Sequence, residues 1–310
     1  MESLHDLDAD TAFVGVDVGG TSTVVQAVRG SVVRVIDGPG ANLQRSGRAS
    51  CAAAVIMLSA QALRSLHGVD RVRMVAGVSG AGRLEEQIGV AAEIEEGLHA
   101  LHVARAISVT VVHDAEIALE AAFGGSSGAI MIAGTGSVVY GRRADGSTVR
   151  TGGWGYLLGD EGSGYRLGKL ALGAICRAYE GGEDTTLTDS IASAFGARSV
   201  DEVISLVYGG GIRLADLAPH VTECAVTGDG VAFSILRQET EALAEQLERM
   251  ATANPDIEPQ YSLFGGLAGV NLFAHNLRSA VRRRLPNWHY VATDALPVAG
   301  AVQMARATSA

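Results

Sequence analysis

The chain has 310 residues, of which 47% are hydrophobic and 19% charged, and its formal net charge is −10. An acidic chain binds nucleic acid and anionic membranes poorly, so we expect neither partner. No stretch approaches the ~20 apolar residues of a membrane span, and the first ten residues show no signal-peptide pattern. The three cysteines, Cys51, Cys176 and Cys224, are far apart. Scattered thiols are typical of a reducing cytoplasm, where we expect the protein, and not of disulfides or a zinc cage.

Residues 13–28 have the pattern strand, tight turn, strand, with Gly19, Gly20 and Thr21 in the turn. Backbone N–H groups and hydroxyls of such a turn can cradle phosphate oxygens. Asp17 lies two residues before the glycines. A carboxylate beside a phosphate is repulsive unless a cation lies between them, so Asp17 implies Mg²⁺. A plain β-hairpin is the alternative for this stretch alone.

The rest of the first half alternates strands and helices. Residues 50–66, for example, carry apolar side chains at helical spacing and end at Gly68. The expected strands are 31–36, 72–78 and 108–112, and the expected helices are 50–66, 84–101 and 115–123.

A second hairpin, residues 129–142, opens the second half. Thr135, Gly136 and Ser137 align without a gap with residues 21–23. This repeat indicates that two related lobes hold one nucleotide. The order βββαβα occurs in both halves, which predicts a duplicated α/β fold with mainly parallel sheets. In the second half we expect strands near 149 and over 261–264 and 289–292, helices over 163–180, 233–251, 271–285 and 297–307, and a helical insert over 188–227.

Asp114 follows an apolar strand, so it lies at the edge of the sheet that faces ligands in open α/β folds. A carboxylate there can accept a hydroxyl proton; the alternative is that Asp114 caps the helix that begins at Ala115. Asn42 and Ser79 are polar groups at loop positions that either bind a sugar hydroxyl or only form turns. The neighbouring His113 is expected to be structural.

Residues 151–169 are rich in glycine and lead into a helix, which is an anion-binding geometry. Asp160 or Glu161 is expected to face Mg²⁺ or a polar substrate, unless residues 160–163 only cap the helix. Trp154 either stacks on a substrate or packs between lobes. The residues around Lys169 do not form a P-loop motif, so we expect Lys169 on the helix surface.

Gly265 and Gly266 follow a strand and precede a helix. Glycine there lets the backbone lie flat against a ligand such as an adenine base.

Taken together, these motifs resemble the N-acetylglucosamine kinase family, which belongs with the activator ATPases of benzoyl-CoA reductase and 2-hydroxyacyl-CoA dehydratase. The resemblance covers nearly the whole chain in the right order. It rests on the sequences at 17–21 (DVGGT), 113–115 (HDA), 134–137 (GTGS), 152–155 (GGWG), 159–162 (GDEG) and 264–266 (FGG).

The resemblance implies an actin-like, duplicated ribonuclease H-like fold, with two lobes around a central cleft that holds ATP. Residues 1–116 and 297–310 would form one lobe, and residues 117–296 the other. Asp17 would hold Mg²⁺ and Asp114 would be the catalytic base. The substrate, an amino sugar, would be bound by Asn42, Ser79, Asp114, Trp154 and Asp160, and ATP by Gly19, Gly20, Thr21, Thr135, Gly136, Ser137, Gly265 and Gly266. Val18 and Ser22 depart from the glycine and lysine that the family often has in the first turn.

The function expected from this resemblance is ATP-dependent phosphorylation of the 6-hydroxyl of N-acetylglucosamine, glucosamine or a relative, by a homodimer. An ATPase activator of a radical dehydratase or reductase is one alternative, although no cysteine follows the Ser79 or Gly136 loops. A non-catalytic sugar sensor is another. Sugar-dependent release of ADP separates the kinase from the sensor, and an iron–sulfur absorption band in anaerobically purified protein would indicate the activator.

Overall fold

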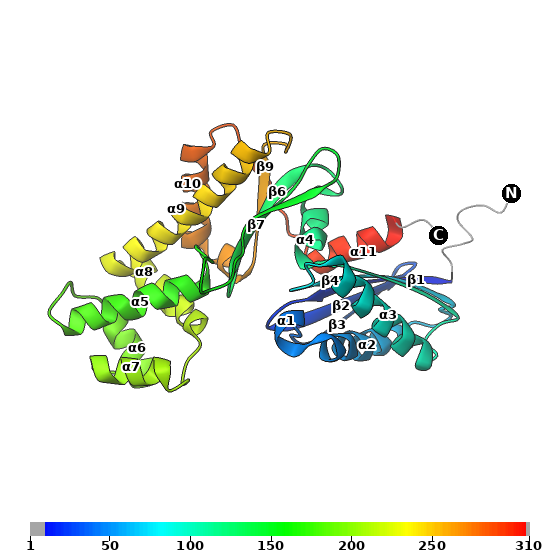
Figure 1. Cartoon of the computed structure of the whole chain (residues 1–310), viewed down its shortest axis with the longest axis horizontal. Helices are drawn as coiled ribbons and strands as arrows, with labels where there is room; N and C mark the ends of the chain where they lie inside the picture. The colour runs from blue at the N-terminus through cyan, green and yellow to red at the C-terminus, as the bar shows by residue number, and fades with distance from the viewer. Residues whose placement is uncertain (1–9, 308–310) are drawn as a thin grey trace. The chain divides into compact units, whose positions relative to one another are not determined.

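The computed structural model describes residues 10–307 (Figure 1). It divides into two compact units: unit 1 runs to Ser126 and resumes at Thr293, and unit 2 is Ser127–Ala292. The first change of unit comes later than the expected boundary after residue 116, because the helix that follows Asp114 packs within unit 1. In the described residues, no helix is both long enough and apolar enough to cross a membrane.

Unit 1 contains one five-stranded sheet in the order β3-β2-β1-β4-β5. The pairs β1–β2 and β2–β3 are antiparallel, whereas β1–β4 and β4–β5 are parallel. Its elements are β1 (Thr11–Val18), β2 (Ser22–Arg29), β3 (Val32–Pro39), α1 (Leu43–Ser46), α2 (Arg48–Arg64), β4 (Arg71–Val78), α3 (Leu84–Ala100), β5 (Ala106–His113), α4 (Asp114–Phe123) and α11 (Pro297–Ala307).

Helices cover both faces of the unit 1 sheet. Val14 and Val16 of β1 pack in one core with residues of α2 and α3. Phe13, on the other face of the same strand, packs in a second core with Ile117 of α4 and Ala301 of α11. Because both faces of β1 are covered, its sequence is nearly continuously apolar, as in buried parallel strands.

Unit 2 repeats this plan with the sheet order β10-β9-β6-β7-β8. The pairs β6–β7 and β7–β8 are antiparallel, whereas β6–β9 and β9–β10 are parallel. Its elements are β6 (Gly128–Ala133), β7 (Ser137–Arg142), β8 (Thr148–Gly152), α5 (Gly164–Tyr179), α6 (Leu187–Phe195), α7 (Val200–Tyr208), η1 (Leu214–Leu217), α8 (Ala218–Val226), α9 (Gly230–Ala253), β9 (Gln260–Phe264), η2 (Gly266–Gly269), α10 (Asn271–Arg284) and β10 (His289–Tyr290).

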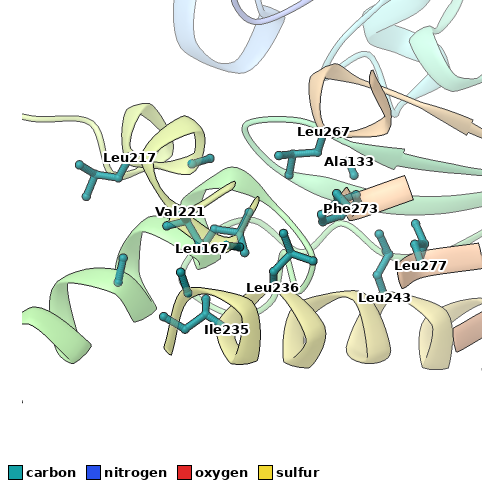
Figure 2. Close-up of a cluster of buried hydrophobic side chains, with 14 of the residues drawn as sticks. Ala133, Leu167, Leu217, Val221, Ile235, Leu236, Leu243, Leu267, Phe273 and Leu277 are labelled. Carbon is teal, nitrogen blue, oxygen red and sulfur yellow. The ribbon is translucent and has the colours of Figure 1, made fainter. Parts of the chain in front are cut away.

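The long helix α9 forms much of the core of unit 2. Its Leu236 and Leu243 point into the same apolar cluster as Leu167 of α5 and Phe273 of α10 (Figure 2). Helices α6 to α8 form the expected insert over 188–227 and contribute Ile191 to this core. The insert is therefore part of the packed unit.

The strand registers define equivalent positions in the two sheets. Val18 pairs with Thr23 across the first hairpin, and Ala133 pairs with Ser137 across the second. Four residues separate the first pair and three the second, so the second turn is one residue shorter. In the same register, Ile132 occupies the place in β6 that Asp17 occupies in β1.

Two local expectations differ from the structure. Helix α1 was not predicted; it forms because the Asn42 side-chain oxygen accepts hydrogen bonds from the N–H groups of Gln44 and Arg45. The last strand, expected over 289–292, is limited to His289–Tyr290. The closing helix begins at Pro297 and ends at Ala307, as predicted.

Candidate functional site

The turn between β1 and β2 is fixed at its base and open at its tip. The Gly19 N–H donates to Ser22 O (2.9 Å), and the Ala41 N–H donates to Gly19 O (3.2 Å). The buried Thr23 hydroxyl donates to Pro39 O (3.0 Å). Gly20 and Thr21 are exposed at the tip. The turn thus presents polar backbone outward from a rigid base, as a phosphate-binding turn requires.

Asp17 and Asp114 lie close enough to interact at the same edge of this sheet. Burial, together with the negative charge of Asp114, raises the pKa of Asp17 to about 7. Asp114 is the first residue of α4, directly after β5, and its side chain is 26% exposed. The edge therefore brings together two partly buried carboxylates.

The N-cap of α4 is His113, not Asp114. Its Nδ1 lies 3.2 Å from the Ala115 N–H and 2.7 Å from Asp114 Oδ1. The Glu116 carboxylate accepts from the His113 N–H (3.2 Å), which completes a capping box. The alternative role of Asp114, capping, is thus performed by its neighbour, and Glu116 has a structural partner.

Asn42 and Ser79 contact each other in unit 1. The Asn42 Nδ2 donates to Ser79 Oγ (3.0 Å), while Asn42 Oδ1 caps α1. Ser79 directly follows β4, and its N–H donates to Val18 O (2.9 Å). The two predicted sugar-binding residues therefore sit together at the carboxyl edge of the sheet that also carries Asp17.

The second turn, between β6 and β7, is joined to the start of α5. The Gly164 N–H donates to Gly134 O (2.8 Å), and the Tyr165 N–H donates to Thr135 O (3.2 Å). The Ser163 hydroxyl caps the next N–H, that of Arg166 (3.2 Å). The expected anion site at this helix N-terminus is thus wrong, because its first N–H groups already have protein acceptors.

Ser137 and Asp160 link the second turn to the glycine-rich loop, residues 152–162. The Ser137 hydroxyl donates to Glu161 O (2.6 Å), a role equivalent to that of Thr23 in the first hairpin. The Asp160 carboxylate accepts from the backbone N–H groups of Ser137 and Gly155. Burial raises the pKa of Asp160, whereas these two hydrogen bonds lower it. Asp160 is only 8% exposed and has a φ of 62°. It caps no helix, since Ser163 is the N-cap of α5.

The remaining predicted residues of unit 2 lie at its surface. Trp154 is 58% exposed, and Lys169 is exposed on α5 as expected. Gly265, with a φ of 93°, and Gly266 are both exposed after β9. A Cβ at Gly265 would overlap Ala133 O, while one at Gly266 would meet no described atom within 4 Å. Gly266 thus offers open space beside the sheet.

Two residues of α9 were not predicted to take part in the site. Glu239 and Gln246 are buried and hydrogen-bonded to the glycine-rich loop. Their signal was present in the sequence, as two polar residues seven positions apart on a largely apolar helix face.

The carboxylate pair of unit 1 fits a bound Mg²⁺. Mg²⁺ prefers oxygen ligands and is usually held by one or two carboxylates together with water and substrate phosphates. The raised pKa of Asp17 reflects burial and a second negative charge, both of which a cation would offset. In the described residues no cluster of three or more His, Cys, Asp or Glu side chains could hold a metal alone. The two carboxylates would hold a metal together with water or substrate oxygens.

Comparison with known proteins places the chain in a family. Residues 14–305 match the model of the BadF/BadG/BcrA/BcrD ATPase family. The chain belongs to this family. Members of this ATPase family use ATP, and the chain has the α/β fold of actin-like sugar kinases.

Curated relatives in the comparison are kinases of amino sugars. The glucosamine kinase GspK of Vibrio cholerae is 30% identical over 237 residues, 73% of this chain and 76% of that protein. The N-acetyl-D-glucosamine kinase of Dictyostelium discoideum is 27% identical over 94% of this chain and 97% of that protein. An N-acetylmuramic acid/N-acetylglucosamine kinase of Clostridium acetobutylicum is 35% identical, over about half (54%) of each chain.

Solved structures show the same architecture. A candidate N-acetylglucosamine kinase from Chromobacterium violaceum superposes with a TM-score of 0.73 at 26% identity, covering 95% of this chain and 98% of that one. A ROK family glucokinase from Streptomyces griseus, solved with glucose and AMPPNP, superposes with a TM-score of 0.62 at 18% identity. The match covers 95% of this chain and 98% of that one. The second likeness supports the fold alone.

Proposed function

We propose that this protein is an ATP-dependent kinase that phosphorylates the 6-hydroxyl of an amino sugar, with Asp114 as the general base. The observation that carries the proposal is the position of Asp114, 26% exposed beside the partly buried Asp17 and on the sheet edge that also holds Asn42 and Ser79. The amino-sugar kinases among the relatives support the substrate class.

In this mechanism Asp114 accepts the proton of the sugar hydroxyl while the hydroxyl oxygen forms a bond to the γ-phosphorus of ATP. The bond between that phosphorus and the β–γ bridging oxygen breaks, and ADP leaves. Ser79 and Asn42 orient the sugar. Because the Asn42 Oδ1 already caps α1, only its amide nitrogen remains to contact a substrate acceptor.

We assign phosphate binding to the two turns, residues 19–22 and 134–136. In the first, the exposed backbone of Gly20 and Thr21 donates N–H groups to phosphate oxygens. In the second, Thr135 and Gly136 have this role, while Ser137 supports the turn through its bond to Glu161. Mg²⁺ held by Asp17 would neutralise phosphate charge. Gly265 and Gly266 would accommodate the adenosine.

The test is the Asp114→Asn variant, which keeps the size of the side chain and removes its basicity. ADP release is measured with glucosamine, N-acetylglucosamine and N-acetylmuramic acid, and the phosphorylated carbon is located by NMR. We expect kcat to fall by roughly 10² to 10⁴, the usual contribution of a general base.

Asp37→Asn, which alters an exposed carboxylate of the same sheet, is the matched control. Near wild-type activity of Asp114→Asn would refute the assigned base. ADP release that no sugar stimulates would instead favour the ATPase activators of the same family.

A further inference from the structure

The glycine-rich loop, residues 152–162, has an exposed tip and a fixed base. Leu157 and Leu158 at the tip are 81% and 77% exposed. Within the loop, the N–H groups of Leu158 and Gly159 donate to Gly155 O (3.2 and 2.9 Å). The loop leaves β8 at Gly152 and reaches α5 after Gly162. Both ends of this segment contact the same face of α9.

Gln246 of α9 contacts both ends of the loop. Its Nε2 donates to Glu161 Oε2 (2.9 Å) near the far end. At the near end its Oε1 lies so close to Gly152 that a Cβ there would overlap it. Gln246 is 1% exposed, and within the described part of the chain its Oε1 is buried without a hydrogen-bond partner. One buried amide thus closes the loop at its base.

Glu239, seven residues earlier on α9, holds the other side of the far end. Its Oε2 accepts from the Gly162 N–H (2.8 Å), and its Oε1 accepts from Arg166 Nη2 (3.2 Å). The Glu239 side chain has no exposed surface. A buried carboxylate is tolerated only when it is paired and hydrogen-bonded, and these donors meet that need.

The loop backbone lies directly against this face of α9. Residues 239, 243 and 246 lie on one side of the helix because of its 3.6-residue period. A Cβ at Gly162, where φ is 86°, would come within 2.7 Å of the Leu243 Cβ. There is therefore no room for the loop base to shift unless these contacts break.

We propose that Glu239 and Gln246 are positioning residues that fix the base of the glycine-rich loop and so set the affinity for the sugar. Asp160 lies next to Glu161, which Gln246 binds, and two residues before Gly162, which Glu239 binds. A shift of the base would move Asp160 and Trp154 together. The effect on the sugar rests on the proposed function, whereas the restraint on the loop does not.

The experiment compares Glu239→Gln and Gln246→Ala with two matched controls on exposed positions of the same helix, Glu245→Gln and Gln238→Ala. Hydrogen exchange of peptides from residues 150–166 reports loop order without any substrate. We expect exchange about tenfold faster in the two buried variants, the effect of losing one buried hydrogen bond, and no change in the controls.

Steady-state kinetics then separate positioning from general stability. At a temperature where fluorescence shows unit 2 of each variant to be folded, we expect the KM for the amino sugar to rise about tenfold, with a smaller change in kcat. A purely structural role would leave both constants at wild-type values under those conditions. If hydrogen exchange of the loop peptides is unchanged in the variants, Glu239 and Gln246 do not restrain the loop. If exchange is faster but KM and kcat are unchanged, the two residues do not position the loop for the sugar.

A variant of nearly the same size tests the contact between Gln246 and Glu161 directly. Gln246→Glu places a second carboxylate beside Glu161, so the loop should exchange faster than in the wild type at pH 8 and approach it at pH 5, where protonation relieves the repulsion. An exchange ratio that does not vary with pH would contradict the contact. If the wild type phosphorylates no amino sugar, the proposed function fails. The hydrogen-exchange measurements then test by themselves whether Glu239 and Gln246 restrain the loop.

Discussion

Asp17 should destabilise unit 1 at neutral pH in the absence of metal. Its pKa in the folded chain is about 7, compared with an ordinary value of 3.8. The folded state therefore binds this proton more tightly than the unfolded state, and its stabilising effect is complete below pH 4 and lost as pH rises to 7. About three pKa units at ~1.4 kcal/mol each give about 4 kcal/mol, of which about 3 kcal/mol is lost between pH 5 and 8.

The Asp17→Asn variant measures this cost, because it keeps a polar group of the same size and removes the charge. In EDTA, the stability of the variant relative to the wild type should increase by about 3 kcal/mol from pH 5 to pH 8. Both tryptophans and all seven tyrosines lie within residues 127–292. Fluorescence therefore reports only the unfolding of unit 2, and circular dichroism with hydrogen exchange of β1 peptides is needed for unit 1.

Two comparisons make the result decisive. Asp37→Asn, at an exposed position of the same sheet, should leave the difference from the wild type equal at both pH values. Mg²⁺ should stabilise the wild type at pH 8 and not Asp17→Asn. A stability difference that stays constant between pH 5 and pH 8 would refute the burial argument for Asp17.

Three further substitutions test the supports of unit 2. Gly265→Ala forces a Cβ against Ala133 O at a φ of 93° and should lower the stability of unit 2 by more than ~1 kcal/mol, as followed by fluorescence. The added methyl group of Gly266→Ala would enter open space among the described residues, so this variant should keep the stability of the wild type and have a higher KM for ATP. Equal melting temperatures of Gly265→Ala and Gly266→Ala would contradict the expected difference between the two positions. Ser137→Ala leaves Glu161 O without its donor and should cost ~1–3 kcal/mol in urea unfolding, and a loss of ATP affinity without any loss of stability would instead assign the hydroxyl to the phosphate.

The repeat of the hairpins made most of the fold predictable. Glycine turns between β-branched strands, followed by helices at regular spacing, defined both sheets and the closing helix to within a few residues. Helix α1 was missed because four residues carry no periodicity, and Asn42 was interpreted as a loop residue. Sequence patterns identify elements from repeated spacing, and a single turn held by one cap has none.

The individual roles in the candidate site were harder to predict than its position. Asp114 was expected at the carboxyl edge of the sheet because it directly follows an apolar strand, and it does follow β5. Ser79, expected only as a loop residue, follows β4 in the same way. The link between Ser137 and residues 160 and 161 could not be predicted, since it joins residues more than twenty positions apart through backbone atoms. The anion site expected at α5 failed for the same reason: the carbonyls that occupy its N–H groups come from the second turn.

The two hairpins share a backbone plan, but at one matched position β1 has an aspartate and β6 has an isoleucine. A carboxylate at that place can attract a divalent cation, and an alkyl chain cannot. The two hairpins therefore differ in charge at this position: the first strand of the first hairpin carries a carboxylate, and that of the second carries an alkyl chain. Replacing Ile132 by aspartate would give the second hairpin the acidic group that Asp17 gives the first.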